Sequence, residues 1–181
     1  MKRLGTALAI ALSLAGCQTS RSGGGGGRQA GGVDVTRTHL GQQLARAQIA
    51  VEPVNAADAN NPEFRAFADA VERHLARHGY TIAPNRPASE QIARVTVTQG
   101  SRAALTTGWP AGLGQGSRQA NVVATLLDVR IQRRSDGTVF WQGRAVAEAP
   151  AGTPRAAVVE RLAEALFRDF PGESGRTIRI R

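Results

Sequence analysis

Residues 121–148 read NVVATLLDVRIQRRSDGTVFWQGRAVAE and predict the hairpin around which the fold is built. In residues 121–133 every second side chain falls on one face of a long strand: Val123, Thr125, Leu127, Val129 and Ile131. Residues 138–148 form the returning strand, with Val139, Trp141, Gly143 and Ala145 on one face. Because Asp136-Gly137 between two strand patterns is a turn signal, the stretch predicts two long antiparallel strands.

Two helices are predicted, one before this hairpin in the sequence and one after it. The first spans Pro62 to His78, with Asn61 as its cap, Pro62 at its first position and Gly79 as its stop. The second spans Thr153 to Phe170, capped by Thr153 and ended by Pro171. Each has an apolar stripe at helical spacing, and these stripes comprise Phe64, Phe67, Ala68, Val71 and Leu75, and Val158, Val159, Leu162, Leu166 and Phe170.

Five further segments have strand patterns. They cover residues 33–38, 48–54, 80–83, 92–98 and 176–181. In the first, Val33, Val35 and Arg37 share a face, and in the second Pro53 indicates a strand end or an edge strand. This order of elements predicts an α+β fold. We expect a two-layer sandwich in which both helices cover one face of a mixed, mainly antiparallel sheet of about seven strands, all within a single domain at 33–181.

The amino terminus predicts a lipoprotein signal peptide over residues 1–16. Lys2 and Arg3 precede an apolar run, Leu4 to Leu14, that is too short to span a bilayer, which needs about 20 residues. The run ends in Leu14-Ala15-Gly16-Cys17, which resembles the lipobox of bacterial lipoproteins. That resemblance implies cleavage between Gly16 and Cys17 and diacylglycerol on the Cys17 thiol. An ordinary signal peptide with an incidental Cys17 is the alternative.

Residues 17–32 predict a lipidated, Gly-rich tether. Five consecutive glycines, Gly23 to Gly27, favour a flexible coil. Gln18 follows the cysteine, and in the lipoproteins that this sequence resembles an Asp there favours the inner membrane. We therefore expect the periplasmic face of the outer membrane. Since Cys17 is the only cysteine, no disulfide is available to the domain.

The charge is strongly basic but does not indicate a nucleic-acid protein. The formal charge of +9 falls to +7 once Lys2 and Arg3 leave with the signal peptide. The remaining basic residues are all Arg, and they are spread along the chain, with Arg133-Arg134 the only adjacent pair after the signal. An exported protein has little access to nucleic acid, so we expect none as a partner. A mild attraction to anionic lipid headgroups fits this charge.

The pattern of the mature domain resembles the lipoprotein family called domain of unknown function 4136 (DUF4136). The matching features are Ile49-Ala50-Val51, His78-Gly79-Tyr80 after a helix, Asp128 on a long strand, the turn at 135–137, Val139-Phe140-Trp141-Gln142-Gly143, and a helix ending in Phe170-Pro171. This family brings no known catalytic residues. The resemblance therefore implies an α+β lipoprotein domain and gives no catalytic residues to carry over to this chain.

Three sequence features are candidate sites. His74 and His78 lie four apart on one helix, a spacing that can hold a metal, but no sulfur or acidic ligand accompanies them, so we favour capping and packing. Gly112, Gly114 and Gly116 are spaced as in a nucleotide loop but lack the flanking strand and helix that such a loop needs. Trp109 lies in a predicted mobile loop, 101–120. It is a candidate partner contact, and folding back onto the domain is the alternative.

These features favour a non-enzymatic lipoprotein that acts in the cell envelope through protein or lipid contacts. We expect no metal and no cofactor other than the covalent lipid on Cys17. One alternative is an assembly or transport auxiliary with a specific membrane partner. The other is a hydrolase of envelope polymers, which requires a cleft with a paired carboxylate or a Ser-His constellation. A structure in which Asp128, Glu148 and the histidines are all separate would exclude it. The sequence leaves the oligomeric state open.

Overall fold

The computed structural model describes most of the predicted domain. The described residues are 31–41, 44–84, 86–110, 113 and 121–181. Outside them lie the predicted signal peptide at 1–16, Cys17 and residues 18–30 of the predicted tether, together with Gly112, Gly114 and Gly116 of the glycine-rich segment.

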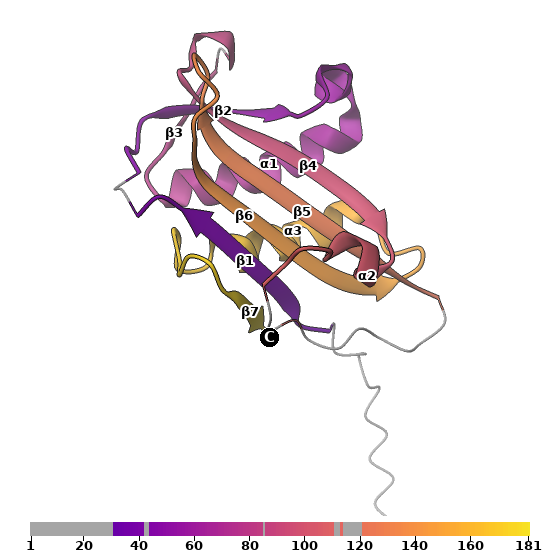
Figure 1. Ribbon diagram of the computed structural model, residues 1–181. Helices are drawn as coiled ribbons and strands as arrows, with labels where there is room; N and C mark the ends of the chain where they lie inside the picture. Colours follow the sequence, from indigo (N-terminus) through magenta and orange to yellow (C-terminus); the bar gives the residue numbers. More distant parts are fainter. Residues whose placement is uncertain (1–30, 42–43, 85, 111–112, 114–120) are drawn as a thin grey trace, which may run out of the picture.

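Seven strands and two long helices form the two-layer α+β sandwich that the sequence predicts (Figure 1). The strands are β1 (Val33–His39), β2 (Gln48–Pro53), β3 (Thr81–Ile82), β4 (Gln91–Gly100), β5 (Val122–Arg133), β6 (Val139–Pro150) and β7 (Thr177–Ile180). The helices are α1 (Pro62–Arg77), the four-residue α2 (Arg102–Leu105) and α3 (Arg155–Phe167), with 3-10 turns at Ala56–Asn60 and Arg86–Ala88.

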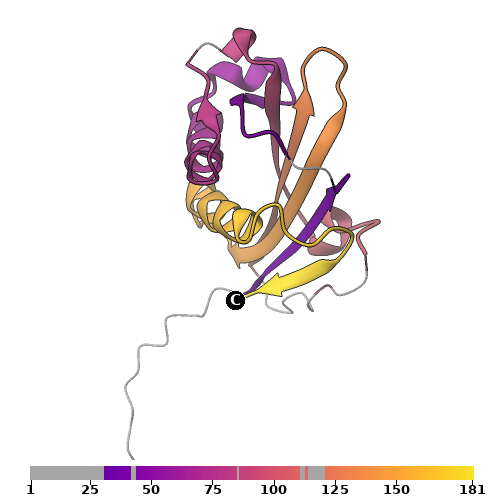
Figure 2. The same cartoon turned by 90° about the vertical axis from the view of Figure 1, so that its left-hand side faces the viewer.

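The sheet is mixed and mainly antiparallel, as expected. Its strand order is β3-β2-β4-β5-β6-β1-β7, and only the β2–β3 and β2–β4 pairs are parallel. Figure 2 shows α1 and α3 side by side on one face of the sheet. The short α2, which the sequence analysis did not predict, lies on the opposite face, where Leu105 packs against Ala124, Leu126 and Val146.

The β5–β6 hairpin is confirmed at the centre of the sheet. Leu127 faces Ala145, Val129 faces Gly143, and Ile131 faces Trp141 across the two strands. The Trp141 indole is fully buried and lies over Gly143, so that a Cβ at residue 143 would collide with it and with Leu166. Gly143 therefore makes the room in which Trp141 packs beneath α3.

The first helix begins and ends as its sequence predicts. The Asn61 side chain accepts a hydrogen bond from the Glu63 amide at 2.9 Å, and Pro62 has no N–H that would need an acceptor there. His78 is the C-cap, and Gly79 then takes a φ of +87°, which costs a glycine little. The buried side chains of α1 are the predicted apolar face together with Ala70 and His74.

The predicted bounds of the second helix are wrong at both ends. The helix α3 begins at Arg155, and Thr153 does not cap it: its hydroxyl donates instead to the Pro150 carbonyl at 2.7 Å. At the other end, α3 stops at Phe167 rather than Phe170. The backbone leaves helical geometry at Arg168, with a ψ of 129°, and at Asp169, with a φ of +58°. The Arg37 side chain, on a distant strand, donates to carbonyl groups at this end.

Arg37 is a fully buried arginine in the helix layer. From the centre of β1 its Nε donates to the Leu166 carbonyl at 2.9 Å, and its Nη2 lies 3.0 Å from the Ala165 carbonyl and 2.8 Å from the Arg168 carbonyl. Burial lowers the pKa of this guanidinium, and the Asp169 carboxylate opposes that shift. A cation at a helix carboxyl terminus is favourable, so Arg37 fastens α3 to β1.

We predict that Arg37→Met lowers the free energy of unfolding by about 3 to 5 kcal/mol, because three buried carbonyl groups lose a charged donor. Urea unfolding followed by circular dichroism measures the change. The control is Arg65→Met on the exposed side of α1, which should stay within about 0.5 kcal/mol of wild type. An Arg37→Met protein as stable as wild type would contradict the role of Arg37.

Candidate functional site

The sheet face opposite α1 and α3, called the open face here, carries an ordered array of charged side chains. Because side chains alternate along a strand, every second residue of β2, β4, β5 and β6 points away from the helix layer. On the open face these positions bring together Glu52, Arg94, Asp128, Arg130, Gln142 and Arg144. Arg134, which directly follows β5, joins them.

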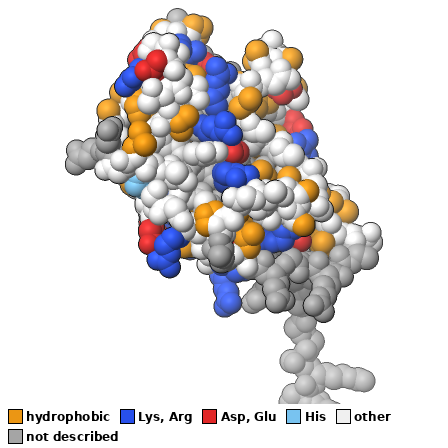
Figure 3. All heavy atoms as spheres, viewed as in Figure 1, with side chains coloured by type: hydrophobic (Ala, Val, Ile, Leu, Met, Phe, Trp, Pro, Cys, Tyr) orange, Lys and Arg blue, Asp and Glu red, His pale blue; other side chains and the backbone are white. Residues whose placement is uncertain are grey.

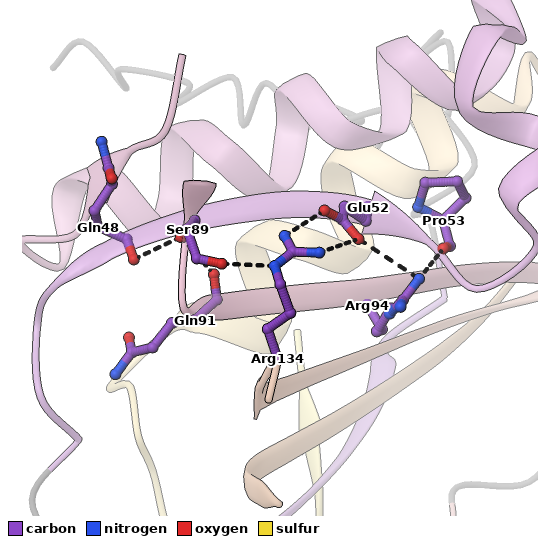
Figure 4. A network of polar contacts seen from close by, with 7 residues as sticks. All are labelled: Gln48, Glu52, Pro53, Ser89, Gln91, Arg94 and Arg134. Carbon is purple, nitrogen blue, oxygen red and sulfur yellow. Dashed lines mark hydrogen bonds and ion pairs between the residues drawn. The ribbon is translucent and has the colours of Figure 1, made fainter. Parts of the chain in front are cut away.

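At one end of the array, Glu52 binds two arginines (Figure 4). Its carboxylate lies 2.6 Å from Nη2 of Arg134 and 3.6 Å from Nη1 of Arg94. The same Arg94 nitrogen donates to the Pro53 carbonyl at 3.0 Å, and Nε of Arg134 donates to the Ser89 carbonyl at 2.7 Å. Glu52 thus holds β2, β4 and the end of β5 together.

In the middle of the array, Asp128 likewise joins neighbouring strands through its side-chain contacts. Gln142 donates its amide to Asp128 at 2.9 Å, and Nε of Arg130 donates to the other carboxylate oxygen at 3.3 Å. Nε of Arg144 lies 3.5 Å from Asp128 in a looser ion pair. The carboxylates of Glu52 and Asp128 therefore form ion pairs with four arginines. We call these arginines the arginine face: Arg94, Arg130, Arg134 and Arg144.

Trp109 lies at the end of the array where α2 packs on the sheet. It is half-buried and packs with Leu105 against Ala124, Leu126 and Val146, and the Arg144 guanidinium lies 4.9 Å from the centre of its ring. The structure thus shows the folded-back arrangement that the sequence analysis kept as the alternative. A role of Trp109 in contacting a partner stays a prediction.

Buried polar contacts fasten the segment 101–110 to the sheet. Asp34 on β1 is completely buried, and it pairs with Arg102 of α2 and with Arg179 of β7. The Ser101 hydroxyl caps α2, and the Pro110 carbonyl accepts a hydrogen bond from Thr177 at 3.1 Å. The described part of the predicted mobile loop is therefore a helical turn attached to the open face.

The histidines lie on the other side of the sheet from this array. His74 is buried and stacks on Phe167 at 5.8 Å, and burial lowers its pKa. His78 bonds to the Phe167 carbonyl at 2.9 Å and His39 to the Gly172 carbonyl at 3.0 Å. All three therefore pack around the end of α3. Within the described residues, no group of three or more His, Cys, Asp or Glu side chains is placed to hold a metal ion.

The structure separates the histidines of the hydrolase alternative from Asp128. Asp128 lies on the open face, whereas His74 and His78 lie in the helix layer, so the sheet separates them. Ser101 caps α2, and the hydroxyls of Thr106 and Thr107 donate to carbonyl groups of the same turn. These hydroxyl groups have local structural uses.

A hollow of about 260 Å³ lies at the end of the sheet remote from Val33. Leu40, Leu44, Phe140 and Arg133 line it, with Ala45, Glu90 and Gln91. It lies beside the described ends of the segment around residues 42–43.

The sequence analysis missed the arginine face, although a signal was present. It used the odd positions of β5 to define the core and did not examine the even positions, where Asp128 and Arg130 lie. Arg94 likewise lies between the core residues Ala93 and Val95. What the sequence could not give is that β2 lies beside β4, which brings Glu52 to Arg94.

The fold and the array define a class of domain: an α+β sandwich with one face covered by helices and one open, arginine-rich face. No protein-family model matches the chain. Over 81 residues it is 38% identical to an uncharacterized protein from Zymomonas mobilis, in a match that covers 42% of this chain and 30% of that protein. The chain thus matches less than a third of its relative's length.

The chain is similar to two solved structures, and the likeness to the first shows the fold. A PDZ domain protein from Parabacteroides distasonis is similar with a TM-score of 0.53 at 9% identity, over 83% of this chain and 39% of that one. A DUF4136 family protein from Bacteroides thetaiotaomicron is similar with a TM-score of 0.41 at 10% identity, over 78% and 97% of the two chains. In the described part of this protein, no helix has the length and apolar character to cross a bilayer.

We predict that Asp128→Asn lowers the free energy of unfolding by about 1 kcal/mol, because Arg130 and Arg144 lose their shared countercharge. Salt screens partly exposed charges, so the loss should shrink at high sodium chloride. Urea unfolding at low and high salt measures it, and Glu173→Gln, which removes an exposed pair with Arg176, should cause no measurable change. A loss that salt leaves unchanged would contradict this electrostatic role.

Proposed function

We propose that the protein is a lipoprotein of the DUF4136 family, anchored by Cys17 to the periplasmic face of the outer membrane. It acts without catalysis, through protein or lipid contacts of its folded domain in the cell envelope. The observation that carries this proposal is the sequence Leu14-Ala15-Gly16-Cys17 directly after a short apolar run. More than one acyl chain on a residue anchors stably, whereas a single chain binds marginally.

The way the domain begins supports an anchor at residue 17. The first strand, β1, begins at Val33 and pairs with β6 on one side and β7 on the other, so the start of the domain is held inside the sheet. Fifteen residues, 18–32, separate Val33 from Cys17, and as a flexible coil they would span roughly 20 Å r.m.s.. Such a tether keeps the domain beside the bilayer without fixing its orientation.

The uses of the polar side chains support a non-catalytic role. The carboxylates Glu52, Asp128 and Asp34 each bind arginine side chains, and His78 caps α3. Catalytic groups are usually arranged with a nucleophile or acid beside a base in one site. Here the charged side chains link neighbouring strands, and the histidines pack around the end of α3. This arrangement favours a domain that acts through binding rather than through catalysis.

We predict that Cys17→Ser releases the protein from the membrane fraction, because the acyl chains have no attachment point. Fractionation of cells that express the full chain measures this, and mass spectrometry of the wild-type protein should find a diacylglyceryl group on an amino-terminal Cys17. The control Ser20→Ala lies in the same tether and should remain membrane-bound. Gln18→Asp should move the anchored protein to the inner membrane if position 18 sorts it.

An unmodified thiol on the wild-type protein, or a leader still attached to it, would contradict the anchor. Co-purification of one envelope protein in stoichiometric amount would instead favour an assembly or transport auxiliary.

A further inference from the structure

Most charged side chains of the array on the open face are arginines. Within the described residues, the four arginines Arg94, Arg130, Arg134 and Arg144 form their ion pairs with two carboxylates, Glu52 and Asp128, so arginines outnumber these partners on the arginine face. At the lower end of the same face, Asp34 is already engaged by Arg102 and Arg179. Figure 3 shows basic side chains gathered along the middle of this face.

Two of these arginines are placed against each other. Arg94 on β4 and Arg130 on β5 are direct cross-strand partners on the same face. Like charges directly opposite on neighbouring strands destabilise a sheet, so this pairing opposes folding. The ion pairs of Arg94 with Glu52 and of Arg130 with Asp128 offset part of this repulsion. Residues that break a local rule of stability are typical of a functional surface.

The guanidinium groups also remain accessible to an acceptor from outside. The side chains of Arg94, Arg130 and Arg144 are 32%, 50% and 29% exposed. Guanidinium groups bind phosphate oxygens through paired donors, and Trp109 beside Arg144 adds an aromatic ring of the kind that is common at membrane interfaces.

We propose that the arginine face binds the anionic headgroups of the phospholipid bilayer to which the chain is anchored, a step that rests on the proposed lipid anchor. The surface is an exposed sheet face rather than a cleft, which suits a planar array of phosphates. With an r.m.s. span of roughly 20 Å as a flexible coil, the proposed tether would keep the domain near those phosphates. Headgroup contacts of the arginine face then set the orientation that the tether leaves free.

The test uses vesicles and the mature chain, residues 17–181, with Cys17→Ser so that no lipid is attached. Co-sedimentation compares equimolar phosphatidylglycerol and phosphatidylcholine with phosphatidylcholine alone. We expect binding to the anionic vesicles only, weakened by salt. The double variant Arg94→Gln/Arg130→Gln should bind about tenfold more weakly, because each arginine near an anionic surface contributes separately. Circular dichroism and thermal melting check that it is folded, and Arg144→Gln provides a second variant.

The matched control is Arg65→Gln/Arg77→Gln, which removes the same charge from exposed positions on α1. It should keep binding within about twofold of wild type. An equal loss in both double variants, or equal binding to neutral vesicles, would overturn the proposal. So would binding of a soluble acidic polysaccharide by the arginine face without binding to vesicles. The Cys17→Ser protein used with the vesicles carries no lipid, so its binding to vesicles does not depend on lipidation. Vesicle binding can therefore be absent although Cys17 is lipidated in cells, or present although it is not, and the two proposals are tested separately.

Discussion

Side-chain alternation along one β-sheet gives this protein two unlike faces, and the rest of the structure follows from that constraint. On one face, Val95, Leu127, Val129 and Ile131 are buried beneath α1 and α3. Moving one residue along the same strands reaches Arg94, Asp128 and Arg130 on the open face. A one-residue slip in register would exchange the two sets, so the apolar core also fixes the positions of the charges.

Side chains of the strand β1 bind α3 on one face of the sheet and the short helix α2 on the other. Arg37 points into the helix layer and holds the end of α3, while Asp34, three residues earlier, points to the other face and binds Arg102 of α2. Burial lowers the pKa of Arg37 and of Arg102, and the nearby carboxylates of Asp169 and Glu148 oppose these two shifts. One short strand thus positions α3, α2 and, through Arg179, the edge strand β7.

Local patterns predicted the fold, and contacts between distant residues determined what the sequence analysis missed. Alternation gave the β5–β6 hairpin, and Asn61, Pro62 and Gly79 gave the ends of α1, because those signals act within a few residues. The end of α3 depends on Arg37, 131 residues before Arg168, and no local pattern contains that contact. The link from Glu52 to Arg134 likewise requires the strand order, and the place of Trp109 requires the sheet on which it packs.

Contact between the open face and the bilayer can be measured directly in cells that express the full chain. A photo-crosslinking amino acid is placed at position 130, on the arginine face, or at position 65, on the outer side of α1. The account predicts that illumination attaches phospholipid to the protein from position 130 and little or none from position 65. A protein adduct at position 130, or equal lipid adducts at both positions in a membrane-bound chain, would contradict it.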